Sequence, residues 1–272
     1  MLCDYHTHTL LCRHAEGWPI DYAAAAAARG LTELGCADHS PMPEDEFDDW
    51  RMLRSDLPRY VDSVEEARAA HPGLPIRLGL EVDYLDEAGA WLDALEGMAQ
   101  WDYLIGSVHY LPGGWDVDNP KWLSLGRWET QTIEEVWDAY FAAYERCIRS
   151  RRFEFCAHPD LVKKFGHVPP VDLRRYYDRV AQAVVDTGTI LELNTSGWHK
   201  PVAEAYPGVD FLTVLAQTGT PIVLSSDAHR PEDVGRDFDR ALALARAAGF
   251  THTAQFVDRD RRLRPLPETT AP

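Results

Sequence analysis

The sequence lacks the features that place a chain in a membrane or outside the cell. No apolar run approaches the roughly 20 residues that span a bilayer, and the N-terminus has no basic start followed by a long apolar stretch. The five cysteines are odd in number and form no CxxC pair, so we do not expect a disulfide framework. We therefore expect a cytoplasmic protein with no membrane partner.

The chain also lacks an excess of positive charge and a recognisable linker. Asp and Glu number 44 against 27 Lys and Arg, a net charge of −17, whereas nucleic-acid binders usually carry a basic surface, so we expect no nucleic-acid partner. No stretch rich in Gly, Ser or Pro divides the chain. We therefore predict one domain over residues 1–272, with the charged, Pro-rich residues 258–272 as a tail or edge hairpin. Nothing in the sequence specifies an oligomeric state.

Short apolar stretches that resemble buried strands are what the chain does have. There are seven of them, at residues 2–8, 33–39, 76–82, 102–109, 153–158, 189–194 and 221–229. A segment with helical character follows each one. Asp21 is expected to cap the first helix, and Thr132 with Glu135 forms a capping-box pattern before another. This alternation predicts an α/β fold, with a parallel sheet or barrel and helices outside.

Potential metal ligands stand at the ends of these stretches, where the active sites of such barrels lie. A lone histidine there is more often structural, but nine ligand-type residues at one topological position favour a polynuclear metal site. The nine are His6, His8, His14, His39, Glu81, His109, His158, Asp227 and His229. Imidazole and carboxylate ligands without thiolate suit Zn, Mn or Fe.

The motifs around these residues resemble a known family. They are HTHT (6–9), ADHS (37–40), GLEVDY (79–84), GSVHYL (106–111), AHPDLVKKFG (157–166), LNTSGW (193–198) and SSDAHRPEDVG (225–235). In type and order they resemble the polymerase-and-histidinol-phosphatase (PHP) superfamily, and more closely its histidinol-phosphate phosphatase branch. The resemblance implies a single-domain, distorted seven-stranded (β/α)7 barrel that binds up to three divalent metal ions.

The resemblance also implies which residues hold each ion. Glu81 would bridge two of them, because it belongs to two of the three ligand sets. The sets are His6, His8, Glu81 and Asp227 for the first ion, His14, His39 and His229 for the second, and Glu81, His109 and His158 for the third.

The activity implied is hydrolysis of L-histidinol phosphate to L-histidinol and phosphate, a step of histidine biosynthesis. A water between two metals would attack phosphorus in line. Asp227 has two possible roles that the sequence leaves open: it accepts a proton from that water as the catalytic residue, or it binds metal only.

Substrate contacts are expected from other residues on the same rim. Five basic residues follow the strand-like stretches, and of Arg127, Lys163, Lys164, Lys200 and Arg230 we favour Arg127, Lys163 and Arg230 as phosphate ligands. Asn194 would bond a substrate hydroxyl or amine, or orient a metal ligand. Glu16 or Asp160 would supply an acidic edge for a cationic amine.

Three alternatives remain beside a histidinol-phosphate phosphatase. The first is a PHP-type phosphoesterase or nuclease acting on another small phosphoester or on nucleic-acid ends. The second is an amidohydrolase-type barrel, which needs a metal-bridging lysine, and no strand-like stretch here ends in Lys. The third is a metal-binding protein without catalysis, against which the presence of both Glu81 and Asp227 argues.

Overall fold

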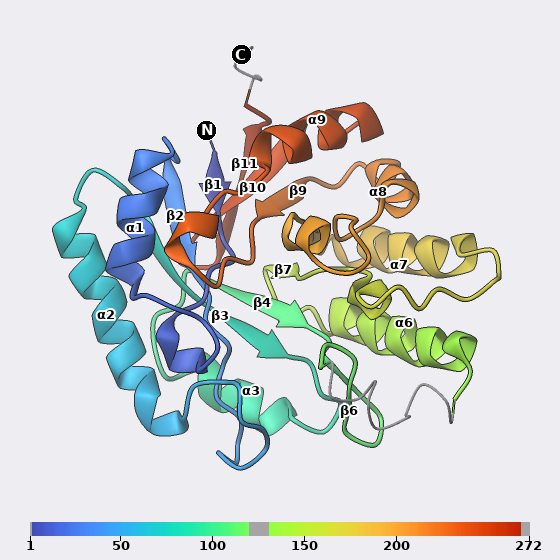
Figure 1. Cartoon of the computed structure of the whole chain (residues 1–272), viewed down its shortest axis with the longest axis horizontal. Helices are drawn as coiled ribbons and strands as arrows, with labels where there is room; N and C mark the ends of the chain where they lie inside the picture. The colour runs from blue at the N-terminus through green and yellow to red at the C-terminus, as the bar shows by residue number, and fades with distance from the viewer. Residues whose placement is uncertain (1, 120–130, 268–272) are drawn as a thin grey trace.

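The computed structural model describes residues 2–119 and 131–267, and shows a sheet flanked by helices (Figure 1). Its strands are β1 (Cys3–Asp4), β2 (Glu33–Cys36), β3 (Ile76–Asp83), β4 (Tyr103–Ser107), β5 (Tyr110–Leu111), β6 (Trp115–Asp116), β7 (Phe155–Cys156), β8 (Ile190–Asn194), β9 (Ile222–Ser225), β10 (His252–Val257) and β11 (Asp260–Pro265). Its α-helices are α1 (Pro19–Ala28), α2 (Leu57–Ala70), α3 (Gly89–Glu96), α6 (Ile133–Ser150), α7 (Arg174–Thr187), α8 (Val209–Ala216) and α9 (Phe238–Ala248).

Nine strands form one sheet in the order β1-β2-β3-β4-β7-β8-β9-β10-β11, and β5 pairs with β6 in a separate hairpin. Neighbours are parallel from β1 to β10, and only β11 runs antiparallel. The sheet curls, because a parallel bridge joins Thr7 to Ala228 beyond the ends of β1 and β9, with His8 N donating to Ala228 O at 2.9 Å. Figure 1 shows α1 and α2 on one side, and α6, α7 and α8 on the other. The predicted α/β fold with a mostly parallel sheet is confirmed.

A strand lies in each of the seven predicted stretches, but two further strands were not foreseen as part of the sheet. β10 continues the sheet beyond β9, and β11 returns along it through residues that we expected to form a tail or edge hairpin. β10 has only a weak apolar signal, because its buried side includes Thr253 and Gln255. The seven-stranded barrel therefore stays a prediction.

Helix starts show where local sequence signals succeeded and failed. Thr132 caps α6 as predicted, since its hydroxyl accepts from Glu135 N at 3.2 Å and its own N–H donates to the Glu135 carboxylate at 2.8 Å. Asp21 does not cap α1, because Pro19 begins that helix two residues earlier. The Asp21 carboxylate instead accepts from Trp18 N at 2.8 Å, inside the first turn.

An aromatic floor fills the interior of the curled sheet below the strand ends. Alternate residues of each strand point inward, and those that meet there include Tyr5, Tyr103, Phe155 and Phe256. Their rings contact one another with centroids 5.2–5.9 Å apart, edge-on or stacked. Gly79 is required by this packing, because a Cβ there would lie 2.5 Å from the Tyr103 ring. The floor separates the polar strand ends from the opposite end of the sheet.

The helices of the described residues pack their apolar faces on the outside of the sheet. None of them combines the length with the apolar character needed to cross a membrane.

Candidate metal centre

The nine predicted ligands converge at the C-terminal ends of the strands, above the aromatic floor. The first set surrounds one oxygen of Glu81, which lies on β3 with Gly79 and Asp83 on the same face. Glu81 Oε2 is 3.3 Å from His6 Nε2 and 3.8 Å from His8 Nε2. Asp227 completes this set, since its Oδ1 is 3.1 Å from His8 Nε2 and 3.8 Å from His6 Nε2.

The other oxygen of Glu81 faces a second pair of imidazoles. Glu81 Oε1 lies 2.9 Å from His158 Nε2 and 3.7 Å from His109 Nε2. His109 follows β4 and His158 follows β7, so strands adjacent in the sheet deliver the two rings to one carboxylate. One carboxylate thus stands between two groups of potential ligands.

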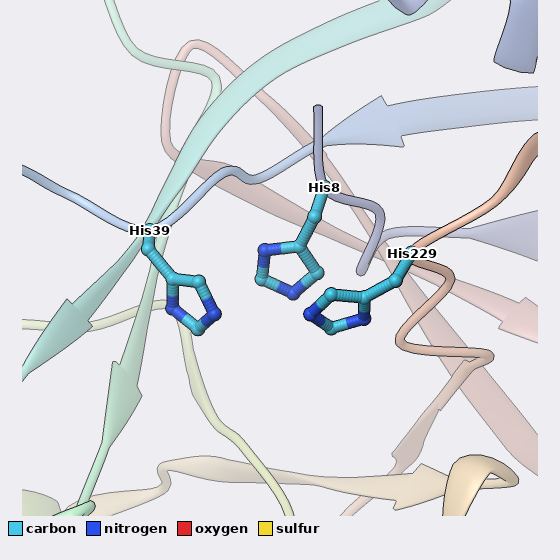
Figure 2. A group of neighbouring side chains, drawn as sticks. All are labelled: His8, His39 and His229. Carbon is cyan, nitrogen blue, oxygen red and sulfur yellow. The ribbon is translucent and has the colours of Figure 1, made fainter. Parts of the chain in front are cut away.

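The remaining imidazoles gather on the solvent side of the first set. Figure 2 shows His8, His39 and His229 with their rings turned toward a common space, each from a different segment. The His8 ring centroid is 4.2 Å from that of His39 and 4.1 Å from that of His229. His14 joins them through its Nε2, which is 2.9 Å from His229 Nε2. His39 Nδ1 also reaches Glu81 Oε2 at 2.8 Å.

The donor atoms fit divalent metal ions. Two ligands on one tetrahedral zinc lie about 3.4 Å apart at usual bond lengths, which is close to the separations around Glu81. Ligand atoms within 4.8 Å of one another include the groups His6–His8–Glu81, Glu81–His109–His158 and His8–His39–His229. His6 Nε2 and Glu81 Oε2 are buried without a hydrogen-bond partner. A buried polar atom left unpaired is costly, and metal coordination removes that cost.

The protonation of the nine predicted ligands in the absence of metal also favours a metal site. Burial lowers the pKa of His6, but Glu192, Glu81 and Asp227 more than offset it and raise that pKa well above its usual value. Burial raises the pKa of Glu81, but the charges of His6 and His109 and the hydrogen bond from His158 hold it well below its usual range. Protons on imidazoles thus balance the buried carboxylates, a role that bound cations would take over.

Two imidazoles are kept neutral instead. Burial, followed by the charge of His8, lowers the pKa of His39 and of His229 well below the usual value. A neutral imidazole is the form that binds a metal ion.

The backbone at two predicted ligands is also unusual, since His158 has φ 24° and Asp227 has φ 52°. Such conformations persist where the surroundings hold a functional side chain in place.

Three carboxylates behind the imidazoles were missed in the sequence. Glu192 Oε1 accepts from His6 Nδ1 at 2.8 Å, and Asp83 Oδ1 lies 2.9 Å from His109 Nδ1. Asp38 Oδ1 is 3.5 Å from His8 Nδ1. Such carboxylates orient the ring and fix which nitrogen faces the metal. Alternation could have found two of them, because Asp83 is two residues after Glu81 and Glu192 is two before Asn194.

Asp227 and Asn194 act as a pair in the structure. Asn194 is fully buried, and its Nδ2 donates to Asp227 Oδ2 at 3.3 Å and to Glu192 Oε2 at 3.0 Å. Ser196 Oγ also donates to Asp227 Oδ2, at 3.2 Å. Asn194 is thus placed to orient Asp227, a predicted ligand, while both of its predicted roles stay predictions.

A pocket of about 440 Å³ opens over the cluster, within the range that holds small ligands. Its lining includes seven of the nine predicted ligands, while His6 and His8 are buried beneath. The other lining residues are Asp49, Trp50, Asp116, Asp118, Asn119, Leu161, Lys164, Ser196, Lys200 and Tyr206. Within the described ranges 2–119 and 131–267, Lys164 and Lys200 are therefore the lysines on this wall.

The basic residues favoured from the sequence are not the ones at the pocket. Lys163 points into a separate cavity, where its Nζ meets Asp160 Oδ2 at 2.8 Å and Glu204 Oε2 at 2.9 Å. Arg230 is exposed and pairs with Glu16 at 3.2 Å. Arg127 lies outside the described residues.

The short 3-10 turn Leu161–Lys163 explains why Lys164 and not Lys163 lies at the pocket, since it points neighbouring side chains in different directions. It buries Lys163 and leaves Lys164 at the pocket. Glu16 pairs with Arg230 and Asp160 with Lys163, and neither carboxylate lines the pocket. Besides the predicted metal ligands Glu81 and Asp227, the acidic residues that line the pocket are Asp49, Asp116 and Asp118.

Comparison with known proteins matches residues 4–196 to the PHP domain family model. A protein of Deinococcus radiodurans named as a probable histidinol-phosphatase is 41% identical over 97% of this chain and 99% of its own length. The histidinol-phosphatase of Bacillus subtilis is 29% identical over 88% of this chain and 97% of its own.

Among solved structures, a histidinol phosphate phosphatase from Lactococcus lactis, complexed with zinc, L-histidinol and phosphate, has the same fold. Its TM-score is 0.81 at 23% identity, and the match covers 96% of this chain and 98% of that one.

Proposed function

The chain belongs to the PHP domain family, and we propose that it is a metal-dependent phosphatase that hydrolyses L-histidinol phosphate to L-histidinol and phosphate, a step of histidine biosynthesis. The observation that carries this proposal is the position of Glu81, with one oxygen facing His6 and the other facing His158. A carboxylate with imidazoles on both sides is suited to bridge two metal ions in a hydrolase site. The Deinococcus and Bacillus relatives support the substrate.

The proposed ions are up to three in number, and the metal is Zn, Mn or Fe. Each ion would be held by one of the three ligand sets, two of which share Glu81. These sets would lie in a ring formed by β1 to β4 and β7 to β9 and closed by the Thr7–Ala228 bridge. Bound there, divalent ions supply positive charge to phosphate oxygens and lower the pKa of a bound water. Zinc in the Lactococcus structure supports the proposal.

Asp227 would act mainly as a ligand. Burial raises its pKa, but the charge of His6 and the hydrogen bond from His8 hold that pKa well below the usual range. The hydrogen bonds from Asn194 and Ser196 to Oδ2 also stabilise the carboxylate form. Such a carboxylate is a weak proton acceptor, so metal binding is favoured over proton transfer as its contribution.

Lys164 and Lys200 would bind the phosphate in place of Lys163 and Arg230. Both line the pocket, and ammonium groups are suited to phosphate oxygens. Lys200 Nζ has no hydrogen bond or ion pair within the described part of the chain, while Lys164 Nζ contacts the Asp118 carboxylate. Asp49, Asp116 and Asp118 make the same wall unfavourable for a nucleic-acid backbone.

The test is phosphate release from L-histidinol phosphate by zinc- or manganese-loaded protein. A panel of glycerol phosphate, a 5′-nucleotide and a single-stranded oligonucleotide runs beside it, with Glu81→Gln as the inactive control. The proposal expects L-histidinol phosphate to have the highest kcat/KM by at least tenfold. Preference for the nucleotide or the oligonucleotide would contradict it.

A further inference from the structure

One wall of the pocket carries a buried carboxylate that has no counter-ion within residues 2–119 and 131–267. Asp116 on β6 is only 4% exposed, yet it lines the pocket. Its Oδ1 accepts from Asp118 N at 2.8 Å, and no cationic side chain of the described residues pairs with it. Burial, reinforced by the charge of Asp118 and opposed by His109, raises its pKa to about 7. A buried carboxylate without a cation is costly to the fold, so its presence calls for a ligand.

The neighbouring carboxylate shows the contrast. Asp118 also lines the pocket, but it is neutralised by the ammonium of Lys164. The attraction of Lys164 outweighs burial and lowers the pKa of Asp118. Among the described residues, Asp118 thus has a cationic partner and Asp116 has none.

The hairpin places Asp116 beside the reacting centre. β5 begins directly after His109, and the β5–β6 register pairs Tyr110 with Asp116. Val117 N also donates to His109 O at 2.8 Å, which ties the end of β6 to that ligand. Asp116 is therefore close to the Glu81–His109–His158 set, where a phosphoester would be bound.

The proposed substrate has a cation at a matching place. In L-histidinol phosphate, three bonds separate the ester oxygen from the amine nitrogen, so the ammonium group must lie next to the phosphate. We propose that Asp116 binds this ammonium group and selects amino-alcohol phosphoesters over phosphoesters that lack the amine. The inference rests on the proposed function and adds to it the residue that recognises the substrate.

A matched pair of substrates tests the inference. One is L-histidinol phosphate, and the other is 3-(imidazol-4-yl)propyl phosphate, which lacks only the amine. A hydrogen-bonded ion pair of this kind is expected to give the wild type a preference of about 10- to 100-fold in kcat/KM for the amine. Asp116→Asn should reduce that preference to less than about threefold, mainly through KM, with the deaminated substrate changed by less than about threefold.

Because the result is a ratio measured on one protein, a partial folding defect does not imitate it. Asp239→Asn is the charge-matched control, since it removes an exposed carboxylate from α9 outside the pocket, and it should keep the full preference. Equal losses on both substrates in Asp116→Asn, or an unchanged preference, would overturn the assignment of Asp116 alone. A wild type that hydrolyses neither substrate would overturn the proposed function and this inference with it.

Discussion

The two ends of the curled sheet are built from the same strands but filled with opposite kinds of side chain. Toward the N-terminal ends lies the aromatic floor of Tyr5, Tyr103, Phe155 and Phe256. At the C-terminal ends the positions are taken by imidazoles and carboxylates that crowd around Glu81. Burial of the rings stabilises the fold, whereas burial of the charged cluster opposes it. The aromatic floor therefore stabilises the end of the sheet that carries the candidate site. Metal binding would offset the remaining free-energy cost of burying the charged cluster.

The largest effect is expected from Glu81→Gln. The change removes the charge that faces both ligand groups, so metal content and kcat/KM should fall together, with kcat/KM lower by about 10⁴-fold. Metal analysis and phosphate release measure the two. Glu33→Gln is the matched control, because Glu33 is also buried and lies at the start of β2 with Arg77. Glu33→Gln should lower the free energy of unfolding while leaving metal content unchanged. Equal loss of metal in both variants would contradict the idea that only one end of the sheet binds metal.

Phe256→Ala is the corresponding change in the floor. Truncating this fully buried ring should cost about 3–5 kcal/mol of unfolding free energy, because the cavity between Tyr5 and Phe155 cannot collapse completely. Denaturant unfolding of the metal-saturated protein measures it. Leu263→Ala on β11, where the side chain is half exposed, should stay within about 0.5 kcal/mol. A cost below 1 kcal/mol for Phe256→Ala would mean that the floor does not stabilise the site end.

Glu192→Gln tests the carboxylates behind the ligands. Glu192 holds His6 Nδ1 through one oxygen and His158 N through the other, both at 2.8 Å. Its loss should weaken metal affinity by about 10- to 100-fold with a smaller change in kcat once the metal is saturating. Competition with a chromophoric chelator gives the affinity. Glu154→Gln removes a carboxylate that contacts Leu104 N and Arg259 but no imidazole, and should leave the affinity unchanged.

The smallest effect concerns a single proton. Burial lowers the pKa of His109, but Asp83 and Glu81 outweigh it and raise that pKa to about 10, so the metal-free protein holds this proton at pH 8. A metal ion must displace it, and affinity should therefore rise with pH toward 10. Without metal, the His109 contribution to stability is complete below its unfolded pKa near 6.5 and is lost as pH rises through 10.

Calorimetry at pH 8 in two buffers of different ionisation enthalpy measures this proton release. Asp83→Asn should reduce the release, because it removes the nearer carboxylate that holds the proton. Binding enthalpies that do not depend on the buffer would contradict the protonated state of His109.

The sequence was sufficient for the parts governed by local pattern. The apolar stretches located seven strands of the curled sheet, and the residues at their ends lie together on one rim, as their position after the strands predicted. β10 was not predicted as a strand of the sheet because half of its buried positions are polar. Only its pairing with β9 shows why these positions are buried. The choice of basic residues at the pocket could not be predicted for a different reason. Whether Lys163 or Lys164 faces the pocket depends on one short turn, and the pairing of Lys163 with Asp160 and Glu204 joins segments far apart in the sequence.

An anomalous-diffraction map of crystals grown with zinc or manganese would test the position of Glu81 between two ions most directly. The account predicts one peak at His6, His8 and Asp227 and another at His109 and His158, with Glu81 contacting both. A map with no peak beside Glu81 would contradict it.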